Sequence, residues 1–221
     1  MLSVVSRFVR CTAVSLMGSS LLLLSPSQSL AQSSSPVPLS DSANPTGATL
    51  PLVSSASQID YSPLQAELEA GDFYDANETT RRLLYEAAGR EDQGWLTPES
   101  IKAIPCQDLK IMDSLWRRYS NNRFGFSVQY NIFQQTGNRP GILRSTDAYE
   151  AFGEAIGWRH DSPEGEGREW IFFKQALDYS VEAPAGHLPN LRSEYQLYGG
   201  RVDYTYLMER LRSCQGGAQS Q

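Results

Sequence analysis

The sequence predicts an all-α protein, a compact helical domain whose helices are joined by long loops. After residue 60, apolar residues recur at spacings of three and four, which is the period of an amphipathic helix. Capping residues, glycines and prolines stand where these periodic segments begin and end. Strand signals are weak, because the best apolar run, residues 170–173, is too short to distinguish a strand from a buried helix.

The first two predicted helices are separated by Gly71, which can end a helix in the left-handed conformation. Leu64 and Leu68 lie four residues apart before this glycine. Asp72 can cap the helix after it, which ends near Gly89. The stripe of small and apolar residues on this second helix consists of Ala76, Thr80, Leu83, Leu84, Ala87 and Ala88.

Two more helices are predicted around Pro105. Thr97 followed by Pro98 is typical of a helix start, and the short helix that they begin runs through Ile104. The helix after Pro105 has one apolar face and is broken at residues 121–122, two asparagines. That face consists of Leu109, Met112, Leu115, Trp116 and Tyr119.

The remaining helices are predicted over residues 126–135, 146–156 and 203–212. Long connections separate them, near residues 137–145, 157–168 and 180–202. Connections of this length inside a compact domain are often functional. No internal repeat is present.

Residues 1–31 have the pattern of a signal peptide. Arg7 and Arg10 flank the start of a mostly apolar run that ends at Leu24, and residues 29–31 (Ser-Leu-Ala) offer small residues to a signal peptidase. The run is short for a spanning helix, which needs about 20 residues, so an uncleaved anchor is the weaker alternative. We therefore expect export, to the periplasm or the thylakoid lumen.

The composition divides the rest of the chain into three parts. Residues 32–59 predict a flexible linker, because they are rich in Ser, Pro, Ala and Gly and contain one charge and no aromatic residue. A helical domain is expected over residues 60–215 and a disordered tail over residues 216–221. That domain is long enough to bury a sizeable core.

The net charge indicates which classes of partner are disfavoured, and the cysteines suggest the redox state of the compartment. A formal net charge of −6 disfavours general nucleic-acid binding. Cys106 and Cys214 remain after signal cleavage, and an even pair suggests a disulfide in an oxidising compartment. The alternative is two buried, unpaired thiols, because sequence alone does not place the two sulfurs within bonding distance.

No motif indicates an enzyme. The two histidines, His160 and His187, lie at no metal-ligand spacing from each other or from a cysteine. The nucleophile-elbow, P-loop and dinucleotide-binding patterns are missing from the sequence. We therefore expect a non-enzymatic protein with no required cofactor and no metal site, and we expect His187 to be a structural turn residue.

The segment PCQDLKIMDSLWRRYSNNRFGFSVQ, residues 105–129, and the later tetrad GHLP, residues 186–189, carry a family resemblance. Together they resemble the genomes-uncoupled porphyrin-binding family, the accessory proteins of magnesium chelatase in oxygenic phototrophs. The resemblance covers roughly residues 61–214. It implies a role in photosynthesis and chlorophyll biosynthesis, and a helical body whose long loops form a cupped ligand-binding face.

A porphyrin is a flat apolar disc with two propionates, so its site needs an apolar slot and cations at the rim. The resemblance and the local sequence place such a site between residues 123–128 and the loop over residues 188–201. Purely structural roles are the alternative for some of these residues. Trp116 and Phe126 can pack in the interior, and Arg123 can donate a hydrogen bond to a carbonyl at a helix end. The candidate binding residues are Arg123, Phe126, Val128, Ile132, Leu188, Leu191, Tyr195, Leu197, Arg201 and Arg210.

These observations favour an exported tetrapyrrole-binding protein that sequesters, carries or senses a pigment. The expected ligand is protoporphyrin IX or Mg-protoporphyrin IX, and membrane-associated pigment enzymes are possible partners. We expect a monomer that binds no nucleic acid. Two alternatives are open: a protein-interaction module on the same scaffold without ligand, and a magnesium-chelatase activator if residues 1–31 are not a signal.

Overall fold

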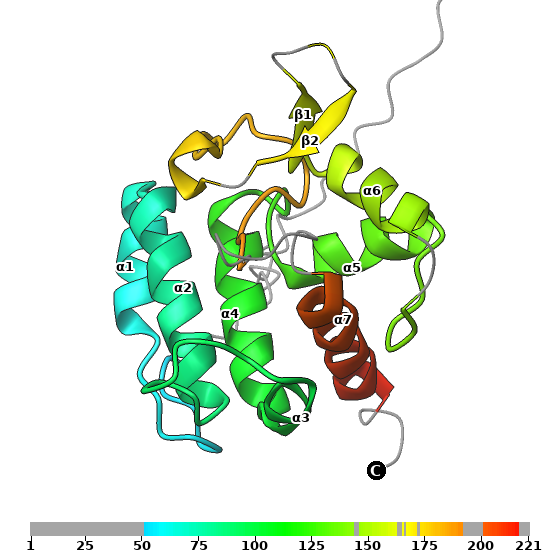
Figure 1. Cartoon of the computed structure of the whole chain (residues 1–221). Coiled ribbons are helices and arrows are strands. Elements are labelled where there is room, and N and C mark those ends of the chain that lie inside the picture. The colour runs from blue at the N-terminus through cyan, green and yellow to red at the C-terminus, as the bar shows by residue number, and fades with distance from the viewer. Residues whose placement is uncertain are drawn as a thin grey trace, which may run out of the picture. The chain divides into compact units, whose positions relative to one another are not determined.

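The computed structural model describes residues 51–143, 146–162, 165, 167–171, 173–191 and 201–216. This part of the chain is mostly helical, which confirms the predicted all-α class (Figure 1). The predicted signal peptide, most of the linker and residues 217–221 lie outside it. No described helix is long and apolar enough to cross a membrane. The elements are α1 (Ser62–Ala70), α2 (Phe73–Ala87), α3 (Pro98–Ala103), α4 (Cys106–Tyr119), α5 (Phe126–Gln135), α6 (Thr146–Ala155), β1 (Arg159–Asp161), β2 (Arg168–Trp170), η1 (Lys174–Ala176) and α7 (Arg201–Gly216).

The helix boundaries follow the local signals in the sequence. Gly71 ends α1 in the left-handed conformation, with φ of 75°. The Asp72 carboxylate caps α2 by accepting a hydrogen bond from the Asp75 amide at 3.1 Å. Thr97 and Ser100 form a reciprocal capping box at the start of α3. The last predicted helix is longer than expected, because α7 runs to Gly216.

The first layer of the core forms where α4 lies against α1 and α2 (Figure 1). Trp116 of α4 is fully buried, and its indole Nε1 donates a hydrogen bond of 2.8 Å to the Thr80 hydroxyl of α2. The Phe73 and Phe124 rings pack around it, with their centroids 5.5 Å apart in an edge-to-face arrangement. Trp116 is therefore a core residue, which settles the alternative raised for it.

The chain that precedes α1 packs against α4 through a buried carboxylate. Asp108 is fully buried and accepts hydrogen bonds from the Ser54 hydroxyl at 2.9 Å and the Tyr61 hydroxyl at 2.7 Å. A further hydrogen bond comes from Ser57. The last residues of the segment assigned to the linker therefore form part of the fold, because their hydroxyl groups replace water around this carboxylate.

The second layer of the core joins α5, α6 and α7. The Phe152 ring of α6 lies between the Phe133 ring of α5 and the Trp158 ring, with centroid distances of 5.3 and 5.8 Å. Trp158 in turn meets Tyr204 of α7 at 4.8 Å. These aromatic contacts fix the start of α7 against the body of the domain.

A short antiparallel hairpin occupies part of the region predicted as a loop over residues 157–168. In it, Arg159 of β1 pairs with Trp170 of β2. Only Trp170 of the predicted apolar run belongs to the strand. The hairpin was missed because β1 consists of polar residues and carries no alternating pattern.

Candidate functional site

The two sequence motifs meet in space, although almost 60 residues separate them. The Gly125 amide donates to the Leu188 carbonyl at 3.0 Å, and the Gly186 amide donates to the Arg123 carbonyl at 2.9 Å. The buried Gln129 amide donates to the carbonyls of Gly186 and Pro189, at 3.0 and 2.8 Å. We call residues 123–129 and 186–190 together the GHLP junction.

Three further elements hold the junction in place. The Trp158 indole donates to the His187 carbonyl at 2.8 Å. Asn77 of α2 exchanges two hydrogen bonds with the Asn190 backbone, at 2.6 and 3.2 Å. The next amide, that of Leu191, donates to the Tyr204 hydroxyl of α7 at 2.8 Å. The junction is therefore a rigid platform from which the chain continues toward α7.

His187 is a structural residue of this platform. Its Nε2 accepts a hydrogen bond of 3.2 Å from the Asp178 amide, which can only donate. The proton is therefore on Nδ1, which donates to the Ile156 carbonyl at 2.7 Å. Burial lowers the pKa of the imidazole and favours its neutral form. In the described part of the chain, no group of His, Cys, Asp and Glu side chains could hold a metal ion.

The apolar residues predicted to bind the ligand differ in how much of each side chain is exposed. Phe126 and Leu188 are fully buried within the junction, so they present no surface to a ligand in this conformation. Val128, Ile132 and Leu191 are half-buried. Tyr195 and Leu197 lie outside the described residues.

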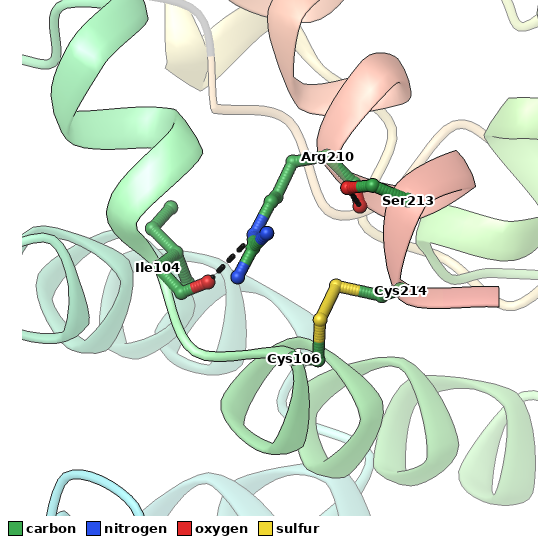
Figure 2. The surroundings of a disulfide bond; sticks show 5 residues. All are labelled: Ile104, Cys106, Arg210, Ser213 and Cys214. Carbon is green, nitrogen blue, oxygen red and sulfur yellow. Dashed lines mark hydrogen bonds between the residues drawn. A yellow bond between two sulfur atoms is a disulfide. The ribbon is translucent and has the colours of Figure 1, made fainter. Parts of the chain in front are cut away.

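The predicted arginines do not gather at one rim. The Arg123 guanidinium donates from Nε to the Ala183 carbonyl at 2.5 Å and from Nη2 to the Glu182 carbonyl at 2.7 Å. It therefore holds the loop that precedes the junction. Arg210 lies nine residues along α7 from the half-buried Arg201, about 13 Å along the axis. Its Nε donates to the Ile104 carbonyl at 2.8 Å, beside the disulfide (Figure 2).

A hollow lies between α3, the loop after α5 and the middle of α7. We call it the α3–α7 hollow; its volume is about 240 Å³. The Lys102 ammonium lies 5.3 Å from the centroid of the Tyr206 ring. Arg212, whose side chain is 57% exposed, pairs with Glu209 at 2.7 Å. The lining residues are Lys102, Pro140, Gly141, Ile142, Tyr206, Glu209 and Arg212.

The lining combines an apolar wall with two cations and the carboxylate of Glu209, which pairs with Arg212. Ile142 is 50% exposed, and Tyr206 supplies an aromatic ring. Such a surface suits one edge of a flat, apolar anion. The sequence reasoning missed this hollow. Positions 206, 209 and 212 share one face of a helix, but no local signal shows that residues 140–142 pack against that face.

The two cysteines of the described residues join α4 to α7. Cys106, at the start of α4, and Cys214, near the end of α7, form a disulfide with their Cα atoms 5.3 Å apart (Figure 2). The predicted bridge is thus present, and the alternative of two free thiols is wrong for this structure.

Comparison with known proteins assigns the chain to a family. The family model described as GUN4-like matches residues 54–208, most of the described domain. The chain belongs to the GUN4-like family. This confirms the resemblance drawn from RFGFSVQ and GHLP.

Relatives of this GUN4-like protein occur in cyanobacteria and plants. The Ycf53-like protein of Synechocystis is 36% identical over 160 residues, which cover 72% of this chain and 60% of the relative. The chloroplastic tetrapyrrole-binding protein of Arabidopsis thaliana is 38% identical over 72 residues, 32% of this chain and 27% of the relative. The chain therefore spans less than two thirds of the length of these relatives.

Solved structures share the fold of this GUN4-like protein. GUN4 from Chlamydomonas reinhardtii superposes with a TM-score of 0.54 and 31% identity, over 71% of this chain and 93% of that one. Ligand-free GUN4 from Arabidopsis thaliana gives a TM-score of 0.52 at 24% identity, a likeness of fold alone.

Proposed function

We propose that this GUN4-like protein binds a tetrapyrrole and holds one edge of the macrocycle in the α3–α7 hollow. The observation that carries the proposal is the lining of the hollow, which offers an aromatic ring, an aliphatic wall and two cations, one of which, Arg212, is paired with the Glu209 carboxylate. A tetrapyrrole has a flat apolar face and propionates that Lys102 and Arg212 would meet. Membership of the family, and the name of the Arabidopsis relative, support the same ligand class.

The size of the hollow limits how the ligand sits. Sites for drug-sized ligands usually have volumes of about 300–1,000 Å³, and this hollow, at about 240 Å³, is smaller. The hollow can therefore hold only one edge of the macrocycle, and other parts of the protein would have to cover the remaining surface of the ligand. The sequence places Tyr195 and Leu197 in the segment that precedes α7, where they are candidates for that cover.

The GHLP junction has a supporting role in this proposal. It fixes Leu191 to Tyr204 at the start of α7, and α7 carries the ring and the arginine of the hollow. A ligand that meets a helix already held in place loses less binding energy to ordering. The buried residues Phe126 and Leu188 thus contribute to binding by holding the platform.

The biological role follows from the binding and the expected compartment. We propose a non-catalytic protein that sequesters, carries or senses protoporphyrin IX or its magnesium form, acts as a monomer and binds no nucleic acid. If residues 1–31 are a signal peptide, the native protein begins at Gln32 and is found in the periplasm or thylakoid lumen. Mass spectrometry that finds an intact Met1 in a soluble cytoplasmic fraction would instead favour the chelatase-activator role.

Tryptophan fluorescence tests the proposed site, because a bound porphyrin quenches nearby indoles. In a titration with deuteroporphyrin, Arg212→Ala should weaken binding about tenfold, since a charge-assisted hydrogen bond contributes roughly 1.5–3 kcal/mol. Arg82→Ala is the matched control: Arg82 is a similarly exposed arginine of α2 that pairs with Glu86, away from the hollow. The control should bind as tightly as the wild type.

Arg123→Ala separates the hollow from the rim that the sequence suggests. If this change weakens binding with the helical circular dichroism and the thermal stability unchanged, while Arg212→Ala does not weaken it, the ligand lies at residues 123–128, and the assignment to the hollow is wrong. If the wild type binds no tetrapyrrole even at tens of micromolar, roughly −6 kcal/mol, the chain is better explained as a protein-interaction module.

A further inference from the structure

We propose that the Cys106–Cys214 disulfide is a redox latch that sets the ligand affinity of the α3–α7 hollow. In the oxidised protein the latch is closed, and a dithiol reductant opens it. The inference rests on the proposed function of the hollow, because affinity is the property that the latch controls.

The position of the bridge next to both walls of the hollow is the first argument. Cys214 follows Arg212 of the α7 wall by two residues, and Cys106 follows Lys102 of the α3 wall by four. The bridge spans 108 residues of sequence but joins two short segments that flank one cavity. A covalent bond here therefore fixes the separation of the two walls.

The second argument is that polar contacts between this end of α7 and α3 are few, so that apolar packing is the main tie besides the bridge. The Arg210 Nε donates to the Ile104 carbonyl, which lies in the short connection between α3 and Cys106 (Figure 2). Within the described residues, the Ser213 hydroxyl donates to the Arg210 carbonyl of the same helix, at 2.8 Å. Without the disulfide, one hydrogen bond, the Lys102–Tyr206 contact and apolar packing would position α7 against α3.

The junction holds the other end of α7 independently of the bridge. Tyr204 is buried, bonds to the Leu191 amide and packs against Trp158. Opening the bridge therefore removes the covalent tie of the C-terminal half of the helix, which apolar packing of Leu207, Met208 and Leu211 still holds, and leaves its start anchored. Arg212 would move relative to Lys102, and the two cations would no longer be held at one spacing for a bound anion.

The chemistry of opening is thiol–disulfide exchange. Cys106 is half-buried, whereas Cys214 is only 6% exposed, so a thiolate of the reductant reaches the Cys106 sulfur first. The S–S bond breaks, Cys214 leaves as a thiolate and takes a proton, and a mixed disulfide forms at Cys106. The second thiol of the reductant then releases the Cys106 thiol, so two electrons pass to the protein and the dithiol becomes a disulfide.

Binding and hydrogen exchange together test the latch. Deuteroporphyrin is titrated into the full chain as oxidised protein, as protein reduced with excess dithiothreitol, and as the Cys106→Ser/Cys214→Ser variant with and without dithiothreitol. We expect reduction to weaken binding about tenfold. The variant should bind with the affinity of the reduced protein, and dithiothreitol should not change that affinity. Amide exchange should rise in residues 207–216 on reduction, and residues 201–206 should stay protected.

The remaining outcomes each decide against the latch. Equal affinity of the oxidised and reduced proteins would make the bridge a structural staple and leave tetrapyrrole binding intact. Loss of helical circular dichroism on reduction, in both the wild type and the variant, would also reduce the bridge to a staple. Absence of binding in every form would overturn the proposed function, and with it the affinity that the latch is proposed to control, whatever the amide exchange shows.

Discussion

His187 acts at the scale of a single residue, because both of its ring nitrogens have partners only in the neutral form. Protonation of Nε2 would set a proton against the Asp178 amide that donates to it. Burial is the main cause of the lowered pKa, and the Asp178 carboxylate, whose own pKa is lowered by hydrogen bonds from Ser180, partly opposes it. Burial also raises the pKa of Asp113, on α4.

The free energy of unfolding should therefore fall as the pH falls below 6.5, the ordinary pKa of histidine. In this range the unfolded chain binds a proton at His187 that the native protein does not bind, so acid favours unfolding. Urea denaturation between about pH 7 and pH 5 should show a smaller loss of stability for His187→Gln than for the wild type. The exposed His160 provides the control, and a His160→Gln protein should lose as much stability as the wild type. Equal pH dependence of all three proteins would contradict this role.

The GHLP junction requires a glycine at position 186, because the backbone there lies close to two isoleucine side chains. Gly186 has a φ of 77°, in the left-handed region, and a Cβ there would lie 3.0 Å from Ile132 Cδ1 and 3.1 Å from Ile156 Cγ2. Gly71, at the end of α1, has nearly the same φ of 75°, but a Cβ there would meet no atom within 4 Å. Alanine substitutions at the two positions therefore distinguish the cost of left-handed backbone strain from the cost of side-chain crowding.

Gly71→Ala should lower the free energy of unfolding by about 1–2 kcal/mol, the cost of a left-handed alanine. Gly186→Ala should lower it by a further 1–3 kcal/mol or so, because the methyl group overpacks the junction. Urea denaturation of the two variants measures the difference. Similar losses in both would mean that Ile132 and Ile156 move aside without cost.

At the scale of the whole molecule, the disulfide links the middle of the chain to its last helix. A cross-link of this kind restricts the unfolded chain, and the stabilisation is typically about 2–4 kcal/mol. Cys106→Ser/Cys214→Ser should therefore lower the melting temperature by roughly 4–16 °C for a domain of this size. Thermal unfolding of the oxidised wild type and the variant measures the shift. A variant as stable as the wild type would mean that strain in the native state cancels the entropic gain.

The architecture around that cross-link was only partly predictable. The cysteine count raised the bridge as one of two alternatives, and the fold decided between them by bringing Cys106 and Cys214 together. The family resemblance placed RFGFSVQ and GHLP in one site, and the hydrogen bonds of Gly125 and Gly186 join them. Neither motif indicated the hollow between α3 and α7 in which we propose that a ligand binds.

The helices could be predicted from the residues alone, because a helix is encoded within a few neighbouring residues. Its hydrogen bonds are local, and Gly71, Asp72 and Thr97 mark its ends wherever the chain folds. The role of each exposed or buried group, in contrast, depends on which distant residues the fold brings next to it. Lys102 lies over the Tyr206 ring, and Asp108 accepts hydrogen bonds from the Ser54 and Tyr61 hydroxyls. These residues are far apart in sequence, so no local pattern predicts the contacts.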